Sequence, residues 1–299
     1  MIRTDAHHHL WELARRPHAW LDGREMDGIR RDFTLADLAP QAKAAGIGRT
    51  VLVQVLPSLA ETAEFLALAG EPDLVAGVVG WADLTCAAVP ETLAALRSGP
   101  GGARLAGIRH LVQGEPDPGW LARPDVRRGL RAVADAGLVY DLLTLPRQLP
   151  AAIEAARALP GLTFVLDHLS KPPIASGALQ PWATLVRELA ALPNVSCKLS
   201  GMVTEAGRPG WTVAGLRPYA EVVLDAFGPS RVMFGSDWPV CLLAASYAEV
   251  VSAVQELAAG LDQDEQADVF GGTAARVYRL PAAGHEGPPG LRGTQTAEA

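Results

Sequence analysis

Eight short runs of apolar, β-branched residues recur along the chain, with amphipathic segments of helix length between them. This alternation is typical of βαβ units, in which consecutive strands run parallel and helices cover the sheet. Eight such units in 299 residues have the expected size of a closed barrel, which leaves no sheet edge exposed. We therefore predict an α/β fold, a (β/α)8 TIM barrel, with strands at about 2–9, 50–55, 74–81, 105–111, 138–143, 162–168, 195–200 and 232–237.

The segments between these strands carry helix start and stop signals. Ser58 is expected to cap a helix that Gly70 ends. Pro124 is expected to open another helix, with Gly137 as its stop. The apolar stripe of the first helix is predicted to be Leu59, Ala63, Leu66 and Ala69.

Composition favours one globular domain. Hydrophobic residues make up 49% of the chain and charged residues 20%, which supplies ample core material. We find no internal linker, so a single domain is expected over residues 1–281. Residues 282–299 are rich in Gly, Pro and small polar residues without periodicity, and they are predicted to form a flexible tail.

Charge and targeting signals exclude several classes of partner. A net charge of −7 without a basic run argues against nucleic acid. The N-terminus lacks a secretory signal pattern and no long apolar stretch occurs, so neither export nor a membrane partner is expected. Three cysteines without a CxxC pair suggest no disulfide framework, and a cytoplasmic location is predicted. The glycines form no nucleotide-binding motif, so no nucleotide cofactor is expected.

Ionisable residues gather at the carboxyl ends of predicted strands that should otherwise be apolar. The first strand ends in three histidines, and because strand side chains alternate, His7 and His9 face the same side. The sixth strand delivers His168 and the eighth delivers Asp237, after a Gly235 that permits close approach of another group. In a barrel these strand ends share one rim, so the sequence predicts that the four side chains meet in one site.

Other polar residues near strand ends are interpreted as pocket-lining residues. Lys198 lies in mid-strand, where a solvated lysine is not expected. Arg109 and His110 are neighbours on one strand, so only one of them faces the site directly. For each such residue the alternative is a structural hydrogen bond, a packing contact or a solvent-facing charge. The residues assigned to the pocket on these grounds are Gln54, Trp81, Arg109, His110, Asp141, Lys171 and Lys198.

The segments DAHHHLW, GIRHLVQ, LDHLSKPPI, VSCKLSGMVTEA, RVMFGSDWPVC and FGGTAARVYRL together resemble the amidohydrolase-related sugar lactonases, the group that contains L-fuconolactonase and L-rhamnonolactonase. The resemblance runs in order over about residues 3–281. It implies the amidohydrolase type of barrel and hydrolysis of a lactone. It also implies catalytic roles for His7, His9, His168 and Asp237, and substrate contacts at Arg109, Lys171, Lys198 and Trp238.

The metal content implied by this resemblance stays open. Dinuclear amidohydrolases carry a bridging lysine or acid on the fourth strand and a histidine on the fifth, whereas this fifth strand reads VYDLL. A two-metal site is therefore not expected. His7, His9 and Asp237, with His168, could hold one divalent ion, zinc above others. Related lactonases also work without metal, and the same histidines would then polarise the carbonyl by hydrogen bonding.

The functional hypothesis is a hydrolase that opens a sugar (aldono-)lactone to the aldonic acid, with Asp237 as general base for water. Its partner is a small-molecule sugar lactone, and the chain is a monomer or a homo-oligomer. The alternatives are a metal-dependent decarboxylase of the same fold, a hydrolase of another cyclic ester or amide, and a non-catalytic binding barrel. The sequence leaves the sugar and the ring size undecided.

Overall fold

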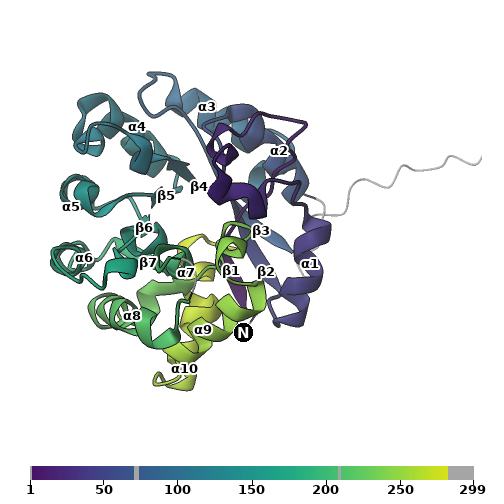
Figure 1. The fold of residues 1–299 in the computed structure, drawn as a ribbon. Coiled ribbons are helices and arrows are strands. Elements are labelled where there is room, and N and C mark those ends of the chain that lie inside the picture. The colour runs from purple at the N-terminus through teal and green to yellow at the C-terminus, as the bar shows by residue number, and fades with distance from the viewer. Residues whose placement is uncertain (1, 71–73, 208–209, 282–299) are drawn as a thin grey trace, which may run out of the picture.

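The computed structural model describes residues 2–70, 74–207 and 210–281, and the predicted tail at 282–299 lies outside them. Eight parallel strands follow one another in sequence order around a common centre, with the helices outside them (Figure 1). The barrel prediction is confirmed, and each predicted strand is present and shorter than predicted, although β2 begins one residue earlier. The strands are β1 (Thr4–His8), β2 (Arg49–Val53), β3 (Val75–Gly80), β4 (Leu105–His110), β5 (Val139–Leu142), β6 (Phe164–Leu166), β7 (Val195–Leu199) and β8 (Val232–Phe234).

The helices that cover the strands vary in length, and short 3-10 turns occupy many of the loops. None of the helices in the described ranges has the length and apolar character needed to cross a membrane. The α-helices are α1 (Leu35–Ala44), α2 (Leu59–Ala69), α3 (Val89–Ser98), α4 (Pro124–Asp135), α5 (Leu149–Ala158), α6 (Trp182–Ala190), α7 (Met202–Glu205), α8 (Val213–Phe227), α9 (Tyr247–Leu257), α10 (Gln263–Ala267) and α11 (Thr273–Val277).

The ends of β1 and β8 are joined by backbone hydrogen bonds that bring the first and last strands together. The amide of Asp237 donates to the carbonyl of His7 at 2.8 Å, and the amide of His9 donates to the carbonyl of Trp238 at 2.7 Å. These two bonds place the N-terminal histidines beside Asp237, which is 230 positions after His7 in the chain. Closure of the barrel thus brings together residues from the two ends of the domain.

Asp5 reinforces this junction from inside β1. Its carboxylate accepts hydrogen bonds from the amides of His7 (3.1 Å) and Ser236 (2.8 Å) and from the hydroxyls of Ser236 (2.6 Å) and Tyr247 (3.1 Å). The side chain is fully buried, and burial raises its pKa to about 6. The four donors stabilise a carboxylate that would otherwise be costly to bury.

The interior of the barrel is a packed core at its amino-terminal half. Small and β-branched side chains from the strands meet Tyr278, which follows α11 and reaches inward. A filled interior confines open space to the two mouths of the barrel. This inner cluster consists of Ala6, Val51, Val53, Val79, Val139, Val165, Met233, Ala274 and Tyr278.

Helix α2 begins and ends where the sequence predicts, and the Ser58 hydroxyl accepts a hydrogen bond from the third amide of the helix at 3.2 Å. Helix α4 likewise starts at Pro124 and is followed by a left-handed glycine. The predicted stripe of α2 is half wrong. Leu66 and Ala69 are buried, but Leu59 is 42% exposed and Ala63 faces outward.

A buried acid explains why the buried face of α2 differs from the apolar stripe that periodicity predicts. Glu61, only 2% exposed, accepts hydrogen bonds from the amides of Val55 (2.8 Å) and Leu56 (2.9 Å) just after β2. Those two amides need an acceptor away from water. Glu61 therefore faces the barrel together with Thr62 and Phe65. The periodicity of apolar residues cannot predict this, because it assigns charged residues to the exposed face.

Replacing Glu61 with alanine should destabilise the fold by about 2–3 kcal/mol, because two buried amides lose their acceptor. Urea unfolding measures this change. Glu64→Ala, on the same helix, is the matched control: its ion pair with Arg16 is exposed, so a loss below about 1 kcal/mol is expected. Equal losses in the two variants would contradict the role assigned to Glu61.

Candidate active site

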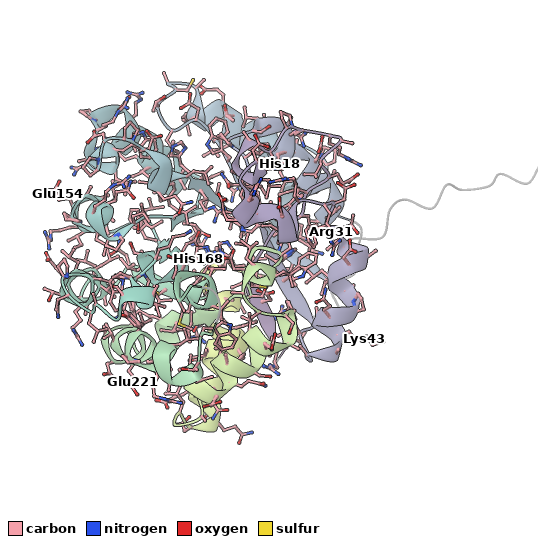
Figure 2. The ribbon with its side chains drawn as sticks, viewed as in Figure 1. His18, Arg31, Lys43, Glu154, His168 and Glu221 are labelled. Carbon is pink, nitrogen blue, oxygen red and sulfur yellow. The ribbon has the colours of Figure 1, made fainter. Side chains whose placement is uncertain are left out.

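The four side chains predicted to form the site do meet at the carboxyl ends of the strands. His7 and His9 come from the end of β1, and Asp237 follows β8. His168 belongs to η7 (Asp167–Ser170), the 3-10 turn directly after β6. Figure 2 shows His168 near the barrel axis, whereas the labelled residues Glu154 and Glu221 lie at the periphery.

Short distances relate the three imidazoles to the carboxylate. Oδ1 of Asp237 lies 3.4 Å from Nε2 of His9 and 3.8 Å from Nε2 of both His7 and His168. The Nε2 atoms of His7 and His9 are 3.1 Å apart. All four residues are at most 5% exposed. The arrangement is a compact polar cluster in a largely water-excluded floor.

Glycines behind the imidazoles allow this compactness. A Cβ on Gly235 would lie 2.8 Å from Cβ of His7, so the close approach that the sequence predicts at this position is present. Gly201, in the left-handed region at φ +67°, would place a Cβ 2.9 Å from the ring of His168. A larger residue at either place would displace an imidazole.

The turn that presents His168 is strained. Four successive residues other than glycine, from His168 to Lys171, have φ between 49° and 59°, in the left-handed region. Such a conformation is costly for each residue and persists only where its surroundings impose it. The indole of Trp182 donates to the carbonyl of Leu169 at 2.6 Å, and Oγ of Ser200 lies 2.8 Å from Nδ1 of His168.

A buried network of charges lies beneath His7. Nζ of Lys198 is 2.9 Å from Oδ1 of Asp167 and 3.1 Å from Nδ1 of His7, and it also donates to Asp141. The hydroxyl of Tyr278 donates to both carboxylate oxygens of Asp141 at 2.8 and 2.9 Å. Lys198 and both acids are fully buried, so each charge is balanced by an immediate partner.

Arg109 connects this network to the open side of the site. Its guanidinium donates to Asp167 at 2.9 Å and to the side-chain oxygen of Gln54 at 3.0 Å. The same group lies 3.2 Å from Nε2 of His7. Gln54 therefore orients Arg109 from behind, and only the arginine reaches the cavity.

The protonation states favour a carboxylate among neutral imidazoles. Burial holds the pKa of His7 well below its ordinary value and lowers the pKa of His168 to about 4. Burial alone would raise the pKa of Asp237, but His168, His9 and Lys171 around the carboxylate outweigh it and lower that pKa. At neutral pH, Asp237 is thus ionised and both of these imidazoles are uncharged.

A cavity of about 570 Å³ opens above this cluster. Its polar floor includes His9, His168, Asp237, Arg109 and Lys171, and Nζ of Lys171 lies 3.5 Å from Glu205. The wall is largely apolar. The remaining lining residues are Trp11, Pro17, Ala19, Trp20, Met26, Val55, Leu56, Leu111, Gln113, Leu143 and Val240.

Six of the eight predicted substrate-contact residues do not line this cavity in the described part of the chain. Gln54, Asp141 and Lys198 lie in the buried network beneath it. Trp238 is fully buried and packs edge-to-face on Phe33. Their strand positions are close to the site, but neighbouring side chains already occupy their polar atoms or cover their faces.

His110 and Trp81 form a separate cluster outside the cavity. The indole of Trp81 donates to Nδ1 of His110 at 3.1 Å, and Nε2 of His110 lies 2.7 Å from Glu115. The His110 ring also stacks on Trp120 at a centroid distance of 4.3 Å. Strand alternation thus sends Arg109 into the site and His110 out of it, so only one of the pair faces the cavity.

Sequence reasoning missed several residues that shape the site. Trp20 and Met26 line the cavity from the long loop after β1, where no periodic pattern marks them. Asp5 and Asp167 hold His7 and Arg109 in place. Strand alternation gave no signal for Asp5, because the register of β1 shifts between Asp5 and His8 and the Asp5 carboxylate meets Tyr247 of α9.

The residues present suit a divalent metal ion. Ligand atoms of His7, His168 and Asp237 all lie within 4.8 Å of one another. Nδ1 of His9 lies 2.8 Å from the carbonyl of Val53, so this nitrogen donates there and Nε2 is the ring atom that faces Asp237. Two or three imidazole nitrogens with one carboxylate oxygen is the donor chemistry of zinc, and an outer hydrogen bond that orients the ring is typical of a ligating histidine.

Comparison with known proteins extends this description. Residues 4–280 match the Amidohydrolase family. Proteins named L-fucono-1,5-lactonase from Burkholderia ambifaria and Burkholderia multivorans are each 41% identical to this chain, over 93% and 94% of it and 96% and 97% of their own lengths. A crystal structure of a Burkholderia multivorans amidohydrolase with bound zinc is 41% identical, with a TM-score of 0.87 over 94% of this chain and 100% of that chain.

Gly235→Ala should destabilise the protein by about 1–3 kcal/mol, because the added methyl group would press on Cβ of His7. Urea unfolding gives the change. Gly260→Ala is the control, since nothing lies within 4 Å of its added Cβ, and a change below about 1 kcal/mol in either direction is expected. Indistinguishable midpoints for the two variants would mean that His7 is not held by this close approach.

Proposed function

This chain belongs to the amidohydrolase family, and from that premise we propose that it is a lactonase that hydrolyses a sugar (aldono-)lactone to the aldonic acid. The observation that carries the proposal is one ionised carboxylate, Asp237, with three imidazole nitrogens within 4 Å, on the floor of a cavity of about 570 Å³. The names of the two relatives that are 41% identical support the same substrate class.

Asp237 is the proposed general base. Water is a weak nucleophile at neutral pH, so a group that removes its proton during attack accelerates the reaction. The lowered pKa keeps Asp237 ionised and ready to accept that proton. Attack on the carbonyl carbon then breaks its bond to the ring oxygen, and Asp237 returns the proton to that oxygen as it leaves. The carboxylate ends the cycle in its starting state.

His168 is the proposed donor to the developing oxyanion. When its Nδ1 accepts from the Ser200 hydroxyl, its Nε2 carries the N–H that faces the cluster. A neutral imidazole keeps this proton at pH 7, and burial favours the neutral form. Donors fixed in advance toward the oxyanion stabilise it without reorganisation, and the loss of one such donor costs on the order of 10²-fold in rate. His9 differs, because its Nδ1 donates to the carbonyl of Val53.

Two cations at the cavity suit a polyol acid. Arg109 and Lys171 both line it, and their N–H groups match the hydroxyls of a sugar ring and the carboxylate that appears in the product. Trp11 and Trp20 supply flat apolar surface against which the less polar face of a sugar packs. The cavity volume falls in the usual range for a small-molecule site.

We also propose that the cluster can hold one zinc ion. His7, His168 and Asp237 would bind it, with His9 adjacent. Bound there, the ion would act as a Lewis acid that polarises the lactone carbonyl. Nε2 of His168 would then be a ligand and would carry no proton, so the ion would replace His168 as the group that stabilises the oxyanion. The proton transfers assigned to Asp237 and the contacts assigned to Arg109 and Lys171 would stay the same.

A panel of aldonolactones, assayed with a pH indicator with and without chelator, tests the function. At least one sugar lactone should release one equivalent of acid per turnover, because ring opening produces a carboxylic acid. Metal analysis of the same samples relates any chelator effect to bound zinc. Inactivity on every sugar lactone, or release of CO₂ from an unsaturated carboxylic acid instead, would exclude the proposal.

Asp237→Asn should lower kcat on a good lactone by about 10²–10⁴-fold, the usual contribution of a general base. Steady-state kinetics on the best lactone of the panel gives the value. Asp135→Asn on the exposed face of α4 is the control and should retain wild-type turnover. Near wild-type kcat in Asp237→Asn would remove this residue from the mechanism.

A further inference from the structure

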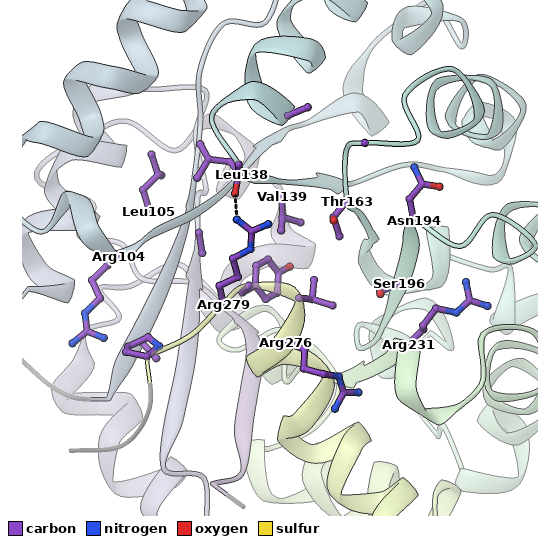
Figure 3. Close-up of a pocket in the computed structure, with 18 of the residues that line it drawn as sticks. Arg104, Leu105, Leu138, Val139, Thr163, Asn194, Ser196, Arg231, Arg276 and Arg279 are labelled. Carbon is purple, nitrogen blue, oxygen red and sulfur yellow. Dashed lines mark hydrogen bonds between the residues drawn. The ribbon is translucent and has the colours of Figure 1, made fainter. Parts of the chain in front are cut away.

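A second cavity, of about 470 Å³, lies at the amino-terminal mouth of the barrel, at the end opposite to the His–Asp cluster. Figure 3 shows its wall, which is built from the first residues of β4, β5 and β7 and from the chain that follows α11. The packed inner cluster separates it from the candidate active site. The proposed reaction has no use for this cavity.

The lining of this cavity is strongly basic. It contains no Asp or Glu among the described residues, whereas the chain as a whole has 33 acidic and 26 basic residues. A local excess of one charge in a protein of net charge −7 is not a consequence of composition. Such a basin attracts and concentrates anions. The five arginines of the lining are Arg97, Arg104, Arg231, Arg276 and Arg279.

Two of these arginines form contacts that stabilise the fold. Arg276 forms an ion pair with Asp268 at 2.6 Å, which offsets its charge. Arg231 donates to a set of backbone carbonyls, including those of Ala190 (2.9 Å) and Phe227 (3.0 Å). Carbonyl oxygens carry no net charge, so the Arg231 guanidinium still contributes positive potential to the cavity.

The other three arginines are available to a ligand. Arg97 and Arg104 have no hydrogen bond or ion pair with any residue that the structure describes. Arg279 makes one such bond, from Nη1 to the carbonyl of Gly137 at 3.2 Å, and its remaining donors have no partner in the described ranges. Among the described residues, these three guanidinium groups thus have few partners for their donors and no acid that offsets their charge.

A serine hydroxyl also opens onto the cavity. Ser196, on β7, is only 5% exposed and lines the cavity, and its hydroxyl makes no hydrogen bond within residues 2–70, 74–207 and 210–281. Ser196 and Thr163 both line the cavity (Figure 3), so the Ser196 hydroxyl is free to bond to a ligand there.

We propose that this cavity binds a phosphorylated small molecule of about the size of a sugar phosphate. The guanidinium fork matches the oxygens of a phosphate group and pairs with its charge. In Figure 3 Arg279 lies between Arg104 on one side and Arg276 on the other, so the charges are spread over the cavity and fit an extended anion with more than one oxygen-bearing group. The Ser196 hydroxyl adds one uncharged donor.

Isothermal titration of the full chain with inorganic pyrophosphate tests the site. One equivalent should bind per chain, and Arg104→Gln and Arg279→Gln should each weaken binding by about tenfold, the value of one charge-assisted contact. Ser196→Ala should weaken it by a smaller factor. Lactone hydrolysis by these variants should stay within twofold of wild type, which verifies that each is folded. Arg→Lys at either position keeps the charge and should give an intermediate affinity.

Two control variants locate the binding. Arg157→Gln removes an exposed arginine, paired with Glu188 on the outer face of α5, and should leave pyrophosphate affinity unchanged. Lys171→Gln, in the His–Asp cavity, should also leave it unchanged. Absence of binding at millimolar pyrophosphate would overturn the proposal. So would equal weakening by Arg157→Gln, or a loss of binding confined to Lys171→Gln.

Discussion

Two cations and two carboxylates are buried in contact with one another directly beneath His7. Lys198 and Arg109 share Asp167, and Lys198 also meets Asp141. Charges in such a place are tolerated only when each has its partners, and removing one would leave another uncompensated at a cost of about 3–5 kcal/mol. The cluster above is arranged on this base, because Lys198 and Arg109 both reach nitrogen atoms of His7.

The same site concentrates conformational strain and close packing. His168 and Lys171 reach the cavity from a left-handed turn that Trp182 and Ser200 hold in place. Gly235 admits the side chain of His7 where a methyl group would not fit. The strained turn and the close packing therefore occur at the residues that carry the proposed chemistry. This is expected where the positions of functional side chains are held at a cost in local stability.

The barrel separates its two mouths by a filled core. At the carboxyl ends of the strands a carboxylate and imidazoles lie below an apolar wall, whereas at the amino ends five arginines line an open basin. Tyr278 connects the two regions through its hydrogen bonds to Asp141. The proposed lactonase site and the proposed anion site are thus distinct in chemistry and in place.

The sequence by itself determined the number and order of the strands and the face shared by His7 and His9, because both follow from local periodicity. It also indicated the rim at which His168 and Asp237 meet them, since parallel strands share one carboxyl edge. Only the tertiary structure decided which neighbours became pocket wall and which became support. Lys198 pairs with Asp141, His110 contacts Glu115, and Trp20 lines the cavity from a loop. These contacts depend on how the folded chain places the side chains, which local periodicity does not determine.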